Sequence, residues 1–131
     1  MLDNLSKKQV EKIFDALPVE LIFVDENDKV CYWNKGEKRK FKVPNKVIGN
    51  DLRSCHRNES LPMVEQLISD LKSGKKDNEI VWASYNRRQL NFFTALRDNN
   101  GKYLGILEYV VDLRVLDKLA EENKDAYRQQ P

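Results

Sequence analysis

Three consecutive β-rich segments in the C-terminal half of the chain constrain its fold most strongly. They cover residues 79–85, 89–97 and 102–113, with the sequences EIVWASY, QLNFFTALR and KYLGILEYVVDL. Three polar residues separate the first two segments, and the turn-forming sequence DNNG at 98–101 separates the last two. Because connections this short join neighbouring strands that run in opposite directions, the segments predict an antiparallel meander.

The remainder of the chain alternates between helical and extended patterns. Apolar residues such as Leu5, Val10 and Phe14 recur at helical spacing until Pro18 ends the pattern. Two short β-rich segments joined by a polar turn predict a hairpin. The predicted order is helix 4–16, strands 20–25 and 29–34, an irregular stretch 35–58, helix 59–73 and, after the meander, helix 114–129.

Helices grouped between antiparallel strands are typical of an α+β fold. We expect a five-stranded antiparallel sheet with helices packed on one face, flanked by an N-terminal and a C-terminal helix. The 131 residues are enough for one hydrophobic core without disulfides or a structural metal. The predicted organisation is an N-terminal helix at 1–17, one domain at 18–113 and a C-terminal helix or tail at 114–131.

Composition argues against several classes of partner. The formal net charge is +2, and no series of aromatic residues is spaced along the eight basic residues between positions 35 and 57. Nucleic acid is therefore not an expected partner. No segment approaches the roughly 18 apolar residues that a membrane helix needs, and the N-terminus has no apolar signal region, so we expect a cytosolic chain without a membrane partner.

The sequence offers little material for catalysis. Two cysteines and one histidine make neither a disulfide framework nor a tetrahedral zinc site, and we expect Cys31, within an apolar segment, to be a structural core residue. Five isolated glycines form no phosphate-binding loop, and no nucleophile elbow is present. We therefore predict a protein that is not an enzyme, with no catalytic residues and no metal site.

Three sequence blocks resemble those of PAS domains. They occur in order across residues 13–113 and read IFDALPVELIFVDENDKVCYWN, VIGNDL and LRDNNGKYLGILEYVVDL. The sequences GNDLRSCHRNES, LKSGK and GILEYVVDL are further similar to a bacterial subgroup at the C-terminal end of proteins that carry a domain of unknown function and a hemerythrin-like region. That subgroup has two prolines after its Cys-His pair, whereas Arg57 and Asn58 follow here. The resemblance implies that other domains of a longer parent protein are partners.

The resemblance also implies a sensory or interaction module with an interior pocket. Strand alternation places Ile106, Glu108 and Val110 on one face of the last segment. Alignment with the PAS pattern implies that this face looks into the pocket, together with Asn91 and Phe93 of the preceding segment. An inward carboxylate must find a partner, reach water or hold a proton, because an unpaired buried charge is costly. These five residues are candidate ligand-binding residues.

Cys55 and His56 complete the candidate set. His56 is a candidate axial haem ligand, and Cys55 a candidate thiolate or redox residue, although a surface or capping histidine and a packed cysteine are the more frequent roles of such residues. Light-sensing flavin PAS domains carry Asn-Cys-Arg-Phe-Leu-Gln around their cysteine and a glutamine late in the last strand, where this chain has Val110. Photochemical flavin adducts are therefore not expected, and noncovalent flavin and a small metabolite stay open.

The opposite face of residues 89–97 is apolar as well, with Leu90, Phe92 and Leu96. It needs a cover, which the N-terminal helix or a second subunit can supply, and the total apolar surface favours a homodimer. We therefore predict a non-catalytic sensor or interaction module that binds a small molecule and signals through dimer or partner contacts. The alternatives are a pure dimerisation module whose pocket is filled by its own side chains, and a haem-based or thiol-based redox sensor.

Overall fold

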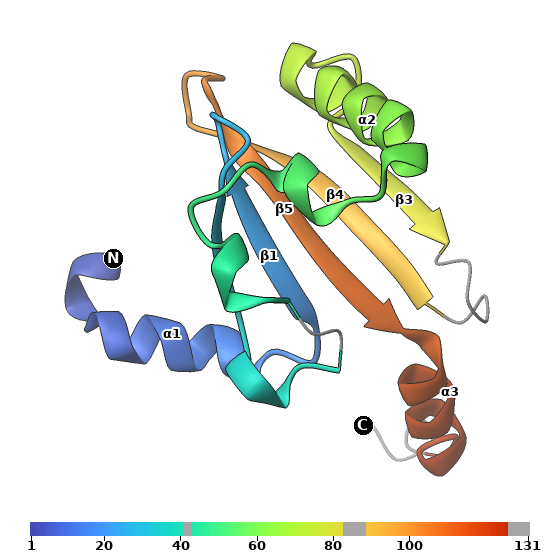
Figure 1. Cartoon of the computed structure of the whole chain (residues 1–131). Coiled ribbons are helices and arrows are strands. Elements are labelled where there is room, and N and C mark those ends of the chain that lie inside the picture. The colour runs from blue at the N-terminus through green and yellow to red at the C-terminus, as the bar shows by residue number, and fades with distance from the viewer. Residues whose placement is uncertain (41–42, 83–88, 126–131) are drawn as a thin grey trace.

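The computed structural model describes residues 1–40, 43–82 and 89–125, and its elements follow the predicted order (Figure 1). The helices are α1 (Lys7–Ala16), α2 (Leu61–Ser73) and α3 (Leu113–Glu122). The strands are β1 (Glu20–Asp25), β2 (Val30–Trp33), β3 (Asn78–Trp82), β4 (Gln89–Arg97) and β5 (Tyr103–Asp112). Short 3-10 helices precede α1 and fill the stretch between β2 and α2; they are η1 (Leu2–Asn4), η2 (Gly36–Lys38), η3 (Asn45–Val47), η4 (Leu52–Cys55) and η5 (Asn58–Ser60).

The five strands form one antiparallel sheet in the order β2-β1-β5-β4-β3. This arrangement confirms the predicted α+β fold with a five-stranded antiparallel sheet. The longest pairing joins β4 to β5, with Gln89 opposite Asp112 at one end and Arg97 opposite Tyr103 at the other. The final part of the strand predicted at 79–85 lies outside the described residues, since the description stops at Trp82 before resuming at β4.

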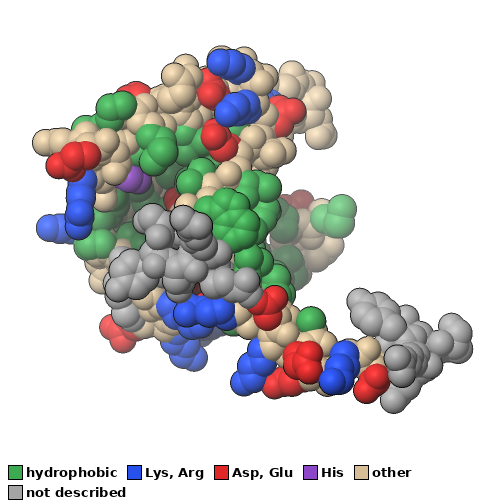
Figure 2. All heavy atoms as spheres, turned by 90° about the vertical axis from the view of Figure 1, so that its right-hand side faces the viewer, with side chains coloured by type: hydrophobic (Ala, Val, Ile, Leu, Met, Phe, Trp, Pro, Cys, Tyr) green, Lys and Arg blue, Asp and Glu red, His purple; other side chains and the backbone are tan. Residues whose placement is uncertain are grey.

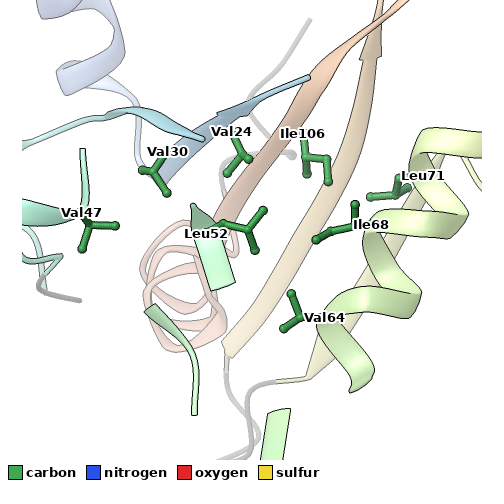
Figure 3. Packing of buried hydrophobic residues seen from close by; sticks show 8 residues of the cluster. All are labelled: Val24, Val30, Val47, Leu52, Val64, Ile68, Leu71 and Ile106. Carbon is green, nitrogen blue, oxygen red and sulfur yellow. The ribbon is translucent and has the colours of Figure 1, made fainter. Parts of the chain in front are cut away.

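The hydrophobic core lies between α2 and one face of the sheet, which we call the inner face. Figure 3 shows the apolar residues of α2 directed toward those of the central strands, where Leu71 is fully buried and Ile106 is 4% exposed. The core members are Val24, Val30, Val47, Leu52, Val64, Ile68, Leu71 and Ile106. Helical spacing in α2 places its apolar residues on one side, so this helix covers the upper part of the sheet in Figure 1.

An ion-pair network fixes the loop that leads into α2. Asp28, in the turn between β1 and β2, accepts hydrogen bonds of 3.0 Å from both Arg53 of η4 and Lys72 of α2. The Arg53 guanidinium also contacts Asp51 and Glu65, with its Nη2 atom 3.1 Å from the Glu65 carboxylate. Because Arg53 binds carboxylates from three places in the chain, η4 is held against both the hairpin turn and α2.

The terminal helices leave the sheet at one end. α1 begins at Lys7, later than predicted, because Ser6 and Gln9 form a capping box with hydrogen bonds of 3.1 and 2.8 Å. No residue of α1 is buried, and the helix extends away from the sheet (Figure 1). It contacts the opposite, outer face at the β2 edge, where the rings of Phe14 and Tyr32 are 5.7 Å apart. α3 starts where Asp112 accepts a 3.0 Å hydrogen bond from the Arg114 amide, and residues 126–129 of its predicted span lie outside the described residues.

Cys31 corrects an expectation. It lies on β2 at the edge of the sheet and is exposed, with its thiol 3.4 Å from a carboxylate oxygen of Asp25. Strand alternation turns it away from the core, while its neighbour Val30 is buried. Among the described residues, no helix combines the length and apolar character that crossing a membrane requires.

Candidate functional site

The strand register decides which side chains share the inner face. Glu108 of β5 lies opposite Ile22 of β1 and Phe93 of β4. Val110 lies opposite Asn91. Residues directly opposite each other in a sheet project to the same side. The structure therefore brings Asn91, Phe93, Glu108 and Val110 together as one half-buried group, which we call the inner-face strip.

Ile106 shares this face but belongs to the hydrophobic core. It lies opposite Val24 and Ala95 and is 4% exposed, because α2 covers this end of the sheet. Its role is therefore packing, which differs from the expectation that it lines a pocket. The inner-face strip starts at Glu108, the next residue of β5 on the same face, and its residues keep intermediate exposure.

Glu108 is the chemically distinctive member of the strip. Loss of solvation raises the pKa of its carboxyl group above the usual value for glutamate, and the nearby side chains of His56 and Arg39 partly oppose this rise. Within the described part of the chain, the Glu108 carboxyl group makes no hydrogen bond and no ion pair at 4 Å or less. It is thus a poorly solvated acid that keeps free hydrogen-bonding capacity.

Arg39 is one of the eight basic residues between positions 35 and 57, yet it is only 3% exposed. Its Nη1 atom donates to the Leu21 carbonyl at 3.0 Å and to the Asn34 side-chain oxygen at 3.3 Å. Its Nε atom lies 4.0 Å from the Glu20 carboxylate. Burial lowers the pKa of Arg39, while Glu20 and Glu108 act in the opposite direction. The guanidinium is therefore oriented by other groups and acts on Glu108 only from a distance.

Asn34 organises this part of the site. Its side chain is fully buried at the end of β2 and accepts a 2.8 Å hydrogen bond from the Leu21 amide. It also donates to the carbonyl groups of Phe14 and Val19, at 2.8 and 2.9 Å. One side chain therefore joins α1, the start of β1 and Arg39. Sequence reasoning missed both polar residues, although a polar Glu20 at the first position of an apolar strand was a signal that a buried partner was needed.

Cys55 and His56 lie at the end of η4 and are both exposed. The His56 Nδ1 atom is 2.9 Å from the Leu52 carbonyl oxygen, so the imidazole is fixed by its own loop. Loss of solvation, with Asp51 and Glu108 adding to it, raises the pKa of the Cys55 thiol. The charge of His56 lowers the pKa of Glu108, and the charge of Glu108 raises the pKa of Cys55, so the pair and the inner-face strip interact electrostatically.

A separate open pocket of about 240 Å³ lies beside β2. It is lined by Trp33, Gly36, Glu37, Val43 and Asn45. Trp33 is opposite Ile22, which in turn is opposite Glu108. Trp33, which lines the pocket, and Glu108 therefore belong to one cross-strand row. Two strand spacings put these positions roughly 10 Å apart. Among the residues that the structure describes, no group of three or more His, Cys, Asp or Glu side chains could hold a metal ion.

Solved structures give the nearest comparisons, since no curated protein matches the chain. A C-terminal domain from Streptococcus mutans is 29% identical with a TM-score of 0.78, and the match covers 88% of this chain and 90% of that one. The PAS domain of a Colwellia psychrerythraea protein is 17% identical with a TM-score of 0.59, covering 80% and 94%. A sensory box sensor histidine kinase from Vibrio cholerae is 13% identical with a TM-score of 0.56, covering 79% and 87%. The last two likenesses show the fold.

A family model described as PAS domain matches residues 10–114, which include the whole sheet, α2 and the inner-face strip. The strand order and the helices on one face agree with this match. The chain therefore belongs to the PAS domain family.

Proposed function

We propose that this PAS domain is a non-catalytic sensor module that binds a small molecule against the inner-face strip. The observation that carries the proposal is the Glu108 carboxyl group, which faces an apolar surface without an ion-pair partner among the described residues. Asn91 beside it adds an amide that can orient a ligand, and Phe93 and Val110 add apolar contact area. Ligand sites commonly combine a few polar groups with an apolar lining in this way.

β5 offers a direct route from the proposed site to the rest of the molecule. The strand carries Glu108 and ends at Asp112, whose carboxylate caps α3. A ligand that changes the twist or position of β5 therefore also changes the direction of α3. A sensor needs such an element, because a ligand shifts a conformational equilibrium only through different contacts in the two states.

We further propose that the domain functions as a homodimer. Its exposed large apolar residues lie on three elements at once, and contiguous exposed apolar surface is typical of interaction sites. Ile13 on α1 is 50% exposed, Trp82 on β3 is 55% exposed and Leu119 on α3 is 50% exposed. Figure 2 shows hydrophobic side chains gathered at the centre of the side that carries the β3 edge. A second copy offers matching apolar surfaces, as two-fold symmetric dimers require.

Two further proposals concern the parent protein and the compartment of the domain. The similar Streptococcus mutans structure is a C-terminal domain, which supports other domains of a longer parent protein as partners. This agrees with the resemblance to the subgroup that carries a domain of unknown function and a hemerythrin-like region.

Cys31 and Cys55 are both free thiols, which is typical of the reducing cytosol, where we place the domain. The raised pKa of Cys55 decreases its thiolate fraction at neutral pH, so a thiol redox sensor is not favoured.

A pure interaction module is the second candidate. It is favoured by Ile106 and the surrounding core, which are filled by the chain's own side chains. Native mass spectrometry of the purified chain separates the two candidates. A sensor with a resident ligand shows a defined noncovalent mass increment that Glu108→Gln reduces, and its released compound can be identified. A protein of unliganded mass that binds nothing from a cell extract of metabolites would leave only the interaction module.

A further inference from the structure

The ligand class of the inner-face strip can be inferred from its charges, an inference that rests on the proposed binding function. We infer that the strip binds an organic amine, with the ammonium group against Glu108 and an apolar body along the neighbouring side chains. Three features of the molecule support this inference: the charges around Glu108, the apolar surface beside it, and the position of Glu108 outside the buried core.

Glu108 has no ion-pair partner within 4 Å among the described residues, and the charges of His56 and Arg39 oppose the rise of its pKa only in part. Two carboxylates, Glu20 and Glu108, lie near the buried Arg39 guanidinium on the inner face. Arg39 directs its donors to the Leu21 carbonyl, to Asn34 and toward Glu20, and it exerts only a longer-range effect on Glu108. A bound cation would therefore complete the balance, and desolvation by the ligand would strengthen the attraction.

An incoming anion finds a less suitable surface. The buried cation next to the strip, Arg39, is 3% exposed, and its Nη1 atom already donates to the Leu21 carbonyl and to Asn34. A carboxylate or phosphate placed on the strip would meet the like charge of Glu108 at close range. Such a contact either repels the ligand or requires Glu108 to bind a proton.

The apolar surface beside Glu108 suits a body that includes an aromatic ring. Phe93 lies directly opposite on β4, and Ile22 lies directly opposite on β1. The row continues to Trp33 and its open pocket of about 240 Å³. A cation beside an aromatic face also gains electrostatic attraction from the ring. Glu108 keeps intermediate exposure as a residue and is not a member of the buried core.

Three probes of similar size test the inference on the intact chain. Phenethylamine, phenethyl alcohol and phenylacetate share the phenyl ring and differ mainly in the charge of the polar end. We expect phenethylamine to bind at least about tenfold more tightly than the alcohol. A hydrogen bond between charged groups exceeds one to an uncharged group by about this factor in affinity. Phenylacetate should bind most weakly. Affinities are measured by titration calorimetry or by chemical shifts, and the wild-type comparison needs no variant.

Two variants assign the preference to its residue. Glu108→Gln retains the shape of the side chain and removes its charge, and should abolish the difference between the amine and the alcohol. Glu59→Gln, at an exposed position in η5, is the matched control and should leave the difference unchanged. Far-ultraviolet circular dichroism confirms that both variants are folded.

The possible failures of the two proposals are distinguishable. Equal binding of amine and alcohol, tighter binding of phenylacetate, or an amine preference that survives Glu108→Gln would each overturn the amine assignment. If the purified chain retains a compound that has no amine, the amine assignment fails and the ligand-binding function stands. If no probe binds and native mass spectrometry finds no ligand, both proposals fail.

Discussion

Replacement of Asn34 by Ala should strongly destabilise the domain. The Asn34 side chain is fully buried and makes three short hydrogen bonds: one to the Leu21 amide at 2.8 Å, and two to the carbonyl groups of Phe14 and Val19 at 2.8 and 2.9 Å. A hydrogen bond between uncharged groups contributes about 1 kcal/mol net, so three contribute about 3 kcal/mol. The substitution also leaves the Leu21 N–H without its partner, which adds about 1–2 kcal/mol.

The expected loss is therefore about 4–5 kcal/mol, a large part of the roughly 5–15 kcal/mol that stabilises a typical domain. Urea unfolding followed by tryptophan fluorescence measures it, and thermal unfolding should show a decrease in Tm of roughly 10–20 °C. Asn58→Ala is the matched control, because Asn58 is exposed, and it should change the stability by no more than about 0.5 kcal/mol. A loss below about 1 kcal/mol for Asn34→Ala would refute the view that this side chain joins α1 to the sheet.

Three further predictions concern the site, the sheet and the dimer. Because the pKa of Glu108 is raised in the folded state, wild-type stability should fall as pH rises from the ordinary glutamate pKa through the raised value. Urea unfolding at several pH values should show that Glu108→Gln lacks this fall. Arg39 and His56, whose charges act on Glu108, are the same in both proteins, so parallel pH profiles would contradict the assignment. Gly105→Ala should destabilise the domain by at least about 2 kcal/mol, because its added Cβ atom would lie 2.1 Å from the Val24 carbonyl oxygen; unaltered thermal unfolding would argue against this close strand approach. Ile13→Lys should shift sedimentation equilibrium from dimer toward monomer with little change in monomer fold, whereas a wild-type chain that stays monomeric at high micromolar concentration would disprove the dimer.

The order of secondary structure was predictable because it depends on local chemistry. Alternating apolar residues and the DNNG turn predicted the hairpin between β4 and β5, and this pairing is confirmed. Helical spacing predicted α2, which ends at Gly74, a residue in the left-handed region with φ of 82°. The start of α1 was misplaced by three residues, because the capping box of Ser6 and Gln9 outweighs the apolar pattern that begins earlier.

The candidate site was predictable only in part. Side-chain alternation, together with the PAS resemblance, placed Glu108, Val110, Asn91 and Phe93 on one face, and the register brings these four together. Alternation does not report how far a helix extends over a sheet, so Ile106 was assigned to the pocket although α2 covers it. The same limit applied to Cys31, because an apolar segment does not distinguish an edge strand from a central one.

Local patterns were enough to predict the elements, their order and the alternation that puts Glu108 and Val110 on one face, since these depend on neighbours a few residues apart. The resemblance to PAS domains, and not alternation, indicated that this face is the inner one. The electrostatic surroundings of the Glu108 carboxyl group depend on tertiary contacts. Arg39 belongs to a stretch of eight basic residues, yet it is buried and donates a hydrogen bond to Leu21, which is 18 positions away. Solvation and counter-charges depend on which distant segments meet, and this decides whether a charged residue is a surface group or part of a site.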